Sequence, residues 1–505
     1  VVGLLGTFLG LGLALNHASH ILGQPNALSA SGAASSMQDL MGLLQGLGTK
    51  FKTSTWGITG FVLLKIWSEF TRFEEKRLIW VIGKVKTELE QRKKAQFVAA
   101  EAAKEALFLQ ISDAANKIGT TAKLYYASKA LLTSDVVRWV VDAGLSVDVS
   151  TGGELAVALA AGAKGERLGL HGNNKSLIEI SKAIANDVGA IVIDSELEIE
   201  RIAAVALAQG KSQAVRLRVN SGVHAHTHEH LATAREDQKF GVALSDVPDL
   251  VAKIRSHSHL RFLGLHSHIG SQIFVVDGFV AAAERLLDVH AQLLQSGDVP
   301  ELNLGGGFGI AYTEADKPLG IEEMATRIMQ AVAAKCTALG IAVPKLAFEP
   351  GRIIAGPAGI TLYSVGTIKD VTVSEQGTGA TRKYVSVDGG MSDNARPALY
   401  QAEYSAMIAS RVTSATAALA RVVGKHCESG DIVVRHDYLP SDISVNDVLA
   451  VAATGAYCFS LSSNYNFLTR PAMVAVKGGK SSLLIRAETE NDLLQRDAGI
   501  GNGKA

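Results

Sequence analysis

The amino-acid sequence predicts an α/β protein with a parallel (β/α)8 barrel followed by an antiparallel β domain. Eight short apolar runs between residues 124 and 349 alternate with helix-like segments. Reactive or glycine residues follow many of these runs, and barrel enzymes carry their chemistry at the carboxyl ends of the strands. After Gly356 the helix-like segments give way to strand-like runs separated by turns, which is typical of an antiparallel sheet.

Composition limits the classes of function. The chain has 505 residues, with 49 basic and 49 acidic side chains and a formal net charge of zero. Because no dense basic run is present to bind a phosphate backbone, we expect no nucleic-acid partner. The three cysteines are too few for a disulfide framework and indicate a reducing compartment.

Residues 1–95 differ from everything that follows. Two apolar runs, 1–15 and 53–64, are each shorter than the roughly 18–20 residues of a confident membrane span. Either they tether the chain to an inner membrane, with membrane contact confined to residues 1–66, or they form a buried helical hairpin. Two patterns in this segment, GLLGTFLGLG and FKTSTWGITG, resemble the MotA/TolQ/ExbB proton-channel family. We expect helices over residues 1–95 and a helical join over residues 96–122.

The strand–helix alternation defines the expected barrel, over residues 123–355. Its strands are expected to begin near residues 124, 145, 167, 190, 214, 262, 301 and 345. Helices are expected over residues 136–141, 153–161, 176–185, 196–207, 247–254, 278–295 and 321–339. A doubly wound open sheet is the alternative, but no GxGxxG pattern follows the first strand.

The expected β domain spans residues 356–496, and residues 497–505 form a tail. Its six strand-like runs lie at residues 360–371, 383–391, 431–439, 447–454, 472–479 and 481–489. Turn residues separate them, so we expect antiparallel pairing.

The first barrel strand ends on a lysine, Lys129. A lysine just past a buried strand is a poor choice for packing. It is a good choice for covalent chemistry, because an amine in an apolar pocket loses its proton and becomes a nucleophile. We therefore place Lys129 at the centre of the expected site.

Other strand ends carry polar groups or glycine. Gly305–Gly307 follow the seventh strand, where bare N–H groups can approach a phosphate closely, although three glycines are also typical of a tight turn. Together with Lys129 and a Glu–Arg pair, this pattern indicates pyridoxal 5'-phosphate (PLP), whose pyridine nitrogen a carboxylate would keep protonated. The remaining strand-end groups are Asp148, His171, Asn173, His266, His268, Glu349, Gly351 and Arg352.

Nine motifs carry a resemblance to a known family. In order they are YYASKA, HGNNKS, EDQKFG, GLHSHIGSQI, LNLGGGFGIAY, EPGR, VDGGMSDNARPALY, GKHCESGD and GAYC. From about Leu124 to Glu490 the chain resembles the fold-type III PLP-dependent decarboxylases, whose barrel is alanine racemase-like, and among them the diaminopimelate decarboxylase family. The resemblance implies a cytoplasmic enzyme of lysine biosynthesis that converts meso-2,6-diaminopimelate to L-lysine and CO2.

The resemblance also implies cofactor contacts. Lys129 would be the Schiff-base lysine, and His268 would stack on the cofactor ring. Ser271 and Gly305–Gly307 would hold the phosphate, and Glu349 would pair with the pyridinium nitrogen. Further contacts would come from Asp148, Pro350, Gly351, Arg352 and Tyr457.

Substrate contacts follow from the same resemblance. The substrate carboxylate would bind Arg352, Arg396 and Tyr400, and Tyr457 would contact both substrate and cofactor. Cys427 would donate the proton, and Glu428 would receive the distal ammonium. In this family these last two residues typically reach the site of the other subunit, so we expect a homodimer with shared active sites.

Two alternatives stay open. His266 and His268, with the histidines at 224, 226, 228 and 230, could serve a metal-dependent barrel hydrolase, although the glycine turn and EPGR fit phosphate better and we expect no metal. Another fold-type III amino-acid decarboxylase is the second alternative. The family's opening strand is not found before Leu124, so residues 1–95 are either a natural fusion or a join of two unrelated sequences.

Overall fold

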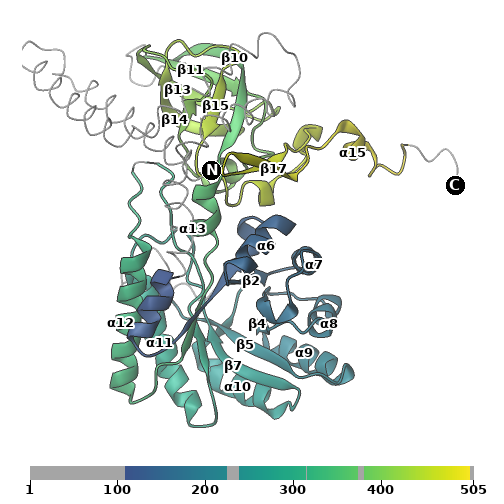
Figure 1. Ribbon diagram of the computed structural model, residues 1–505, viewed down its shortest axis with the longest axis vertical. Coiled ribbons are helices and arrows are strands. Elements are labelled where there is room, and N and C mark those ends of the chain that lie inside the picture. Colours follow the sequence, from purple (N-terminus) through teal and green to yellow (C-terminus); the bar gives the residue numbers. More distant parts are fainter. Residues whose placement is uncertain (1–108, 224–237, 314, 374–379, 501–505) are drawn as a thin grey trace, which may run out of the picture. The chain divides into compact units, whose positions relative to one another are not determined.

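The computed structural model describes residues 109–223, 238–313, 315–373 and 380–500 (Figure 1). Our predictions for residues 1–95 and for the histidine-rich segment 224–230 lie outside the described residues. The chain divides into two compact units. The barrel unit contains Ala102–Ile310 and Lys317–Ala355, and the β unit contains Ala311–Asp316 and Gly356–Ala505.

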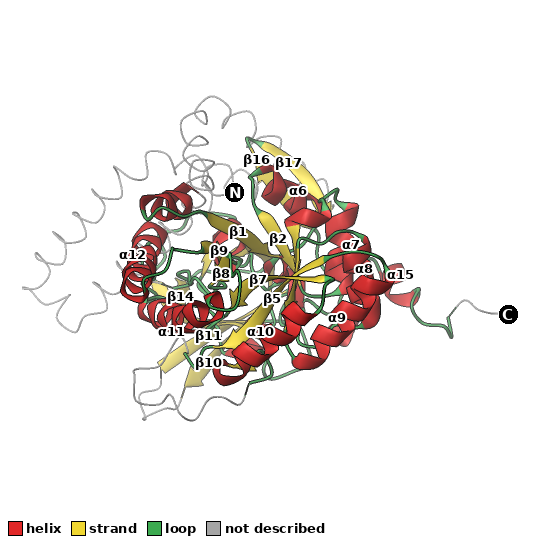
Figure 2. Cartoon of the chain, turned by 90° about the horizontal axis from the view of Figure 1, so that it is seen from below, coloured by secondary structure: helices red, strands yellow, loops and turns green. Residues whose placement is uncertain are grey.

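The barrel unit is a closed parallel sheet. Hydrogen bonds connect the strands in the order β4-β3-β2-β1-β9-β8-β7-β5, and pairing of β4 with β5 closes the ring (Figure 2). The short β6 (Val242–Ala243) pairs with the end of β5. The strands are β1 Ala122–Ala127, β2 Ser146–Val149, β3 Leu168–Leu170, β4 Ala190–Ile193, β5 Gln213–Asn220, β7 Leu260–His266, β8 Glu301–Asn303 and β9 Lys345–Phe348. The predicted (β/α)8 barrel and its eight strands are confirmed.

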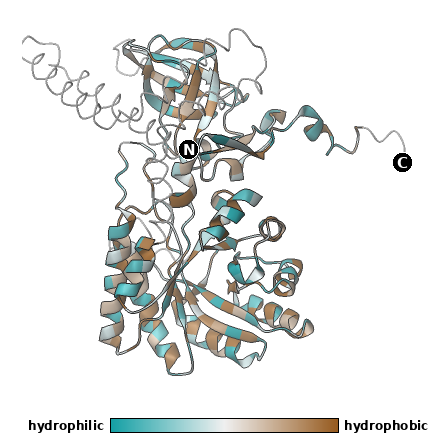
Figure 3. Cartoon of the chain, in the orientation of Figure 1, coloured by the Kyte–Doolittle hydropathy of each residue, from teal (hydrophilic) through white to brown (hydrophobic). Residues whose placement is uncertain are grey.

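Helices surround this ring (Figure 2), and apolar and polar residues are interspersed along them (Figure 3). They are α6 Ser134–Asp142, α7 Gly152–Ala160, α8 Leu177–Ala185, α9 Glu196–Ala208, α10 Val247–Ser256, α11 Asp277–Leu294 and α12 Ile321–Leu339. Side-chain caps fix several starts: Thr133 accepts from Val136 N, and Ser176 forms a capping box with Glu179. Among the described residues, no helix combines the length and apolarity needed to cross a bilayer.

The barrel interior is packed with apolar strand residues, as expected for a sheet buried on both faces. All four residues of β2 and of β4 are buried. One fully buried charge, Arg216 of β5, donates to Tyr125 Oη at 2.8 Å and to Glu301 Oε2 at 2.7 Å. At Gly264 in β7, a Cβ would lie 1.8 Å from the carbonyl oxygen of Glu301, so only glycine lets β7 and β8 pair.

The β unit contains a six-stranded sheet in the order β12-β15-β10-β11-β13-β14. Its pairings are antiparallel except β11 with β13, which is parallel. The strands are β10 Thr361–Val373, β11 Ala380–Val387, β12 Ala406–Ile408, β13 Ala417–Val423, β14 Ile432–Pro440 and β15 Val448–Val451. The mostly antiparallel sheet was predicted, but β12 and β13 were not.

Smaller elements complete the two units. A hairpin of β16 (Met473–Lys477) and β17 (Lys480–Ile485) forms a separate two-stranded sheet in the β unit. The short helices are α13 Arg352–Ala355 in the barrel unit and α14 Arg396–Tyr400 and α15 Glu490–Leu494 in the β unit. The 3-10 turns are η1 Ser128–Ala130, η2 Gly165–Arg167, η4 Leu244–Asp246, η5 Gly356–Ala358, η7 Phe459–Leu461 and η8 Tyr465–Phe467.

Candidate active site

Lys129 lies in the one-turn helix η1, directly after β1. Its neighbours Ser128 and Ala130 are buried, but the lysine side chain itself is exposed. The apolar pocket expected around Lys129 is therefore not formed within the described part of this single chain. The physical reason is its position: it stands past the end of the strand, beyond the packed barrel interior.

Glu349 follows β9 and is buried at the centre of a polar cluster. Its Oε1 accepts from Asn303 Nδ2 at 2.7 Å and lies 3.0 Å from His266 Nε2 and 3.5 Å from His171 Nε2. Burial alone would raise the pKa of Glu349, but His266 and His171 outweigh it and hold that pKa well below its ordinary value. The cluster therefore keeps a negative charge on Glu349.

A second buried carboxyl, Asp148 at the end of β2, belongs to the same cluster. Its Oδ1 lies 3.1 Å from His171 Nε2. Burial, and then the negative charge of Glu349, raise the pKa of Asp148 well above its ordinary value. Burial lowers the pKa of His171 to about 4. The pKa values of the two carboxyl groups are thus shifted in opposite directions although both groups lie close to the same histidine.

His268 stands at the end of β7, two residues after His266. Its Nδ1 accepts a hydrogen bond from Gly306 N at 3.2 Å. Burial, and then the nearby Lys129 ammonium, lower the pKa of His268 to about 3, so its ring is neutral. A neutral, flat imidazole fixed through one nitrogen is suited to stacking on an aromatic ring.

The turn at Gly305–Gly307 has no room for side chains. A Cβ on Gly305 would lie 2.5 Å from Ser267 O, and one on Gly306 would lie 2.0 Å from Glu349 O. Gly305 and Gly307 also have φ of 68° and 112°. Beside this turn, Arg352 donates from Nη2 to Ser271 Oγ at 2.9 Å. Bare backbone N–H groups and a hydroxyl are the groups that bind phosphate.

Pro350 and Gly351 connect Glu349 to Arg352 and pack on the first strand. The carbonyl of Pro350 accepts from Ala127 N at 3.1 Å. A Cβ on Gly351 would lie 3.0 Å from the Ala127 Cβ. The EPGR segment is thus held against the segment that carries Lys129.

The remaining predicted residues lie in the β unit. Arg396 is buried, donates to Tyr404 Oη, and places its guanidinium 4.5 Å from the ring centroid of Tyr312. Tyr400, by contrast, is 64% exposed. Tyr457 adopts φ of 62°, an uncommon left-handed conformation for a tyrosine.

Cys427 and Glu428 lie in an exposed loop after β13. The loop is fixed from one side by Asp431, whose Oδ2 accepts from His426 N and lies 2.9 Å from His426 Nδ1. Asn466 Oδ1 accepts from Cys427 N at 3.1 Å. The loop is therefore ordered at its base while its two predicted functional side chains face solvent.

Sequence reasoning missed Asn303, Tyr404 and Asp431. Asn303 ends the seventh barrel strand, so the strand-end rule that selected the glycine turn could have selected it as well. No sequence signal pointed to Tyr404 or Asp431, because their contacts depend on the fold of the β unit.

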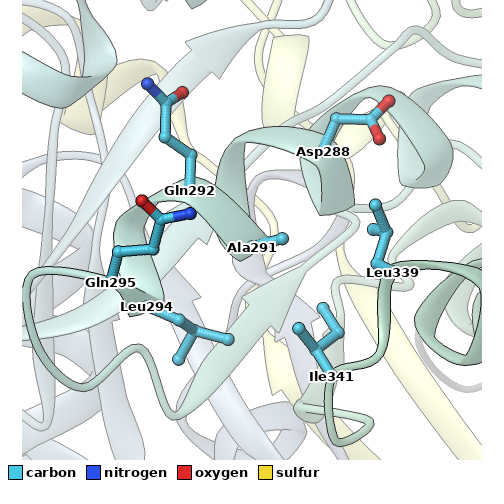
Figure 4. A pocket seen from close by; sticks show the side chains of 7 residues that line it. All are labelled: Asp288, Ala291, Gln292, Leu294, Gln295, Leu339 and Ile341. Atoms are coloured by element: carbon cyan, nitrogen blue, oxygen red, sulfur yellow. The ribbon is translucent and has the colours of Figure 1, made fainter.

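Two other features, a possible metal site and a separate pocket, do not account for the cluster of residues at the strand ends. The ligand atoms of His171, His266 and Glu349 lie within 4.8 Å of one another, as a metal site would require, but the contacts between these side chains already account for their arrangement. A shallow pocket lies elsewhere in the barrel unit, between α11 and the segment before β9, with Asp288, Gln292, Leu339 and Ile341 in its lining (Figure 4). It contains none of the strand-end residues.

The barrel site fits PLP on its own geometry. Asp148 Oδ2 and His266 Nδ1 are buried and have no hydrogen-bond partner among the described residues, which is typical of groups that meet a bound polar molecule. A glycine turn for phosphate and an ionised carboxylate for a ring nitrogen complete the set. Fold and site therefore define the class of PLP-dependent barrel enzymes.

Comparison with known proteins narrows this class. Residues 105–356 match the family model described as pyridoxal-dependent decarboxylase, pyridoxal binding domain. The chain belongs to the diaminopimelate decarboxylase family. Its family was predicted from the nine motifs, and that prediction is confirmed.

Relatives of known sequence and solved structures support the same family. The diaminopimelate decarboxylase of Mycobacterium bovis is 47% identical over 437 residues, covering 85% of this chain and 97% of that protein. The Bacillus subtilis enzyme is 42% identical over 389 residues, covering 76% and 87%. The crystal structure of the M. jannaschii enzyme with L-lysine has a TM-score of 0.71 at 28% identity, covering 78% of this chain and 89% of that chain.

Proposed function

We propose that this chain is a diaminopimelate decarboxylase that uses PLP to convert meso-2,6-diaminopimelate to L-lysine and CO2. The observation that carries the chemistry is the ionised, buried Glu349 beside a glycine turn at the carboxyl ends of the barrel strands. The substrate is taken from the relatives, which are named diaminopimelate decarboxylases at 42% to 52% identity. A solved relative with L-lysine bound supports the product.

The barrel residues bind and tune the cofactor. Bound PLP supplies an electron sink for the electron pair left on Cα when CO2 departs. Lys129 provides the amine that attaches the cofactor. Glu349, because it stays ionised, holds a proton on the ring nitrogen, and the neutral ring of His268 stacks on the ring face.

Further barrel residues orient the group. Gly305–Gly307 and Ser271 bind the phosphate, and Arg352 orients the Ser271 hydroxyl through the 2.9 Å hydrogen bond. Asp148 supports the cofactor with its second, unpaired oxygen. Pro350 and Gly351 keep Glu349 and Arg352 in register with the first strand.

The β unit, together with Arg352 of the barrel unit, supplies groups for the substrate. Arg396 and Arg352 bind carboxylate, because a guanidinium can donate two parallel hydrogen bonds to it, and Tyr400 adds a hydroxyl. Glu428 receives the distal ammonium, and Tyr457 contacts substrate and cofactor. Cys427 returns a proton to Cα from its thiol.

We also propose a homodimer with shared active sites, acting in the cytoplasm. Cys427 and Glu428 are exposed in the single chain, as residues that serve a neighbouring copy must be. The three cysteines, all among the described residues, are free, which suits a reducing compartment.

Absorbance, covalent trapping and turnover test the proposal together. Purified protein incubated with PLP should gain a visible absorbance band, and borohydride reduction should fix the cofactor on Lys129, as read by peptide mass mapping. The same protein should release CO2 and form L-lysine from meso-2,6-diaminopimelate. Absence of the band, or attachment to another lysine, contradicts the proposal.

A further inference from the structure

Asn303, the last residue of β8, connects two parts of the cofactor site. Its Nδ2 donates to Glu349 Oε1 at 2.7 Å, and its Oδ1 accepts from Gly305 N at 2.8 Å. The side chain is fully buried. One amide group therefore contacts both the carboxylate and the first residue of the glycine turn.

Only one orientation of this amide satisfies both partners. If the amide were flipped, Nδ2 would face the Gly305 N–H, donor against donor, and Oδ1 would face a carboxylate oxygen. A buried mismatch of this kind is costly. Because the pKa of Glu349 is held low, its Oε1 acts as an acceptor, and this fixes the Asn303 amide.

The contacts on Glu349 are unequal. Oε1 accepts from Asn303 and has His266 Nε2 at 3.0 Å and His171 Nε2 at 3.5 Å. Oε2 is hydrogen-bonded to His266 Nε2 at 3.2 Å, its one hydrogen bond among the described residues. Oε1 is thus the oxygen that Asn303 anchors, and Oε2, with one hydrogen bond from its histidine neighbour, has capacity to accept a further one.

The strands themselves do not need this side chain. Backbone hydrogen bonds already connect β8 and the glycine turn to β9: Leu304 N donates to Ala347 O at 3.0 Å, and Glu349 N donates to Gly305 O at 2.8 Å. Because backbone hydrogen bonds already join these segments, the side-chain amide of Asn303 is not needed to pair the strands. Its contact with Glu349 therefore indicates that it places the carboxylate.

We propose that Asn303 is a positioning residue for the cofactor. Resting on the proposed function, it holds Oε1 of Glu349 so that Oε2 faces the ring nitrogen, and through Gly305 it keeps that carboxylate at a fixed distance from the phosphate turn. The two ends of the bound cofactor are thereby held at a fixed spacing, and His266 is the second anchor of the Glu349 carboxylate, through Oε2.

Two variants separate the two hydrogen bonds. Asn303→Leu removes both, whereas the nearly isosteric Asn303→Asp keeps the acceptor for Gly305 N and replaces the donor by an oxygen that repels Glu349. Apoenzyme is titrated with PLP and with pyridoxal, which lacks the phosphate, and binding is followed by absorbance and fluorescence. Both variants should bind PLP at least about tenfold more weakly. Asn303→Asp should keep the wild-type preference for PLP over pyridoxal, and Asn303→Leu should lose part of it.

A double-mutant cycle with Glu349→Ala tests whether Asn303 acts through Glu349. In the Glu349→Ala background, Asn303→Asp, which keeps the acceptor for Gly305 N, should weaken PLP binding by less than about threefold. His290→Leu is the matched control, because His290 is also buried in the same unit, on α11, and among the described residues it forms no hydrogen bond or ion pair with a strand-end group. It should leave the PLP affinity unchanged at pH 8.

Three outcomes overturn the inference. The PLP affinity of Asn303→Asp could lie within twofold of the wild-type affinity, or the Asn303 substitution could weaken PLP binding by the same factor with and without Glu349. In the third outcome, His290→Leu loses as much PLP affinity as the Asn303 variants. Thermal melts of each apoenzyme show whether a variant is folded, and Asn303→Asp serves if Asn303→Leu is not. If the wild-type protein itself forms no visible band with PLP, the proposed function fails. If the wild-type protein binds PLP but the effects of the Asn303 and Glu349 substitutions are additive, only the inference about Asn303 fails.

Discussion

Asp148 and Glu349 approach the same histidine from two barrel strands, with His171 Nε2 at 3.1 Å from Asp148 Oδ1 and 3.5 Å from Glu349 Oε1. The pKa of Asp148 is raised and that of Glu349 is lowered. Two buried carboxylates cannot both carry a charge so close together without a large cost. The opposite shifts of the two pKa values lower this cost, because they favour the proton on Asp148 over the proton on Glu349.

Replacing Glu349 by Gln should reduce kcat more than it changes KM. The amide cannot hold a proton on the ring nitrogen, so the electron pair left by CO2 is poorly accepted. We expect kcat to fall about 100-fold or more. Steady-state kinetics with saturating PLP measures it, and an unchanged kcat would remove Glu349 from the mechanism.

Replacing Lys129 by Ala should abolish decarboxylation and the borohydride-fixed adduct together. The other amine close to these groups, Lys175 in the loop after β3, is held in an ion pair with Glu198 at 2.7 Å. Lys164→Ala, at an exposed lysine in the same unit, is the control and should keep both properties. Full turnover by the Lys129 variant would contradict the assignment of Lys129 as the lysine that attaches the cofactor.

Replacing Arg396 by Ala should mainly raise KM. A charge-assisted hydrogen bond to carboxylate contributes about 1.5–3 kcal/mol, so KM should rise about tenfold to a hundredfold with a small change in kcat. Because Arg396 also packs on Tyr312 and Tyr404, thermal melts must accompany the kinetics. Tyr438→Ala, at an exposed tyrosine of the same unit, is a control. A variant whose KM stays at the wild-type value contradicts substrate binding.

Shared active sites predict complementation between inactive chains. Lys129→Ala and Cys427→Ala homodimers should each be inactive, but mixed dimers contain one site with both wild-type residues. After subunits are exchanged at random, activity should recover to about one quarter of wild type, as symmetry requires for a dimer. No recovery in a mixture shown to contain mixed dimers would mean that each chain completes its own site.

Stability should fall as the pH drops from about 6.5 toward 4, partly through His290. Burial lowers the pKa of His290 to about 4, below the ordinary 6.5, so the unfolded chain binds more protons in this window. The contribution of His290 to the free energy of unfolding is present above pH 6.5. It falls by up to about 3 kcal/mol as the pH approaches 4. The slope of Tm against pH should be flatter in His290→Leu than in wild type. Equal slopes would mean that folding does not lower the pKa of His290.

Much of the barrel could be predicted because its strands are short apolar runs bounded by turns and separated by periodic helices. The β unit was harder. Ala417–Val423 is rich in alanine, which favours helix, yet pairing with β11 and β14 makes it a strand. Three-residue β12 is too short to give a pattern. In both places, partners distant in the sequence decide the local structure.

Some residues of the candidate site could likewise be predicted from the sequence, and others could not. Lys129, His268, Glu349 and the glycine turn were found because each follows a strand, and the parallel sheet brings strand ends together. The surroundings were not found. The exposure of Lys129, the amide of Asn303 and the tyrosines around Arg396 depend on side-chain packing between segments that the sequence pattern leaves unconnected.

The crowded turn at Gly305–Gly307 has a consequence for protein engineering. Neither Gly305 nor Gly306 can accept a methyl group without displacing main-chain atoms of Ser267 or Glu349. Variant libraries intended to change the amino acid that is decarboxylated should therefore leave this turn constant. Diversity belongs at exposed positions such as Tyr400 and Glu428, where side chains can change without moving the backbone.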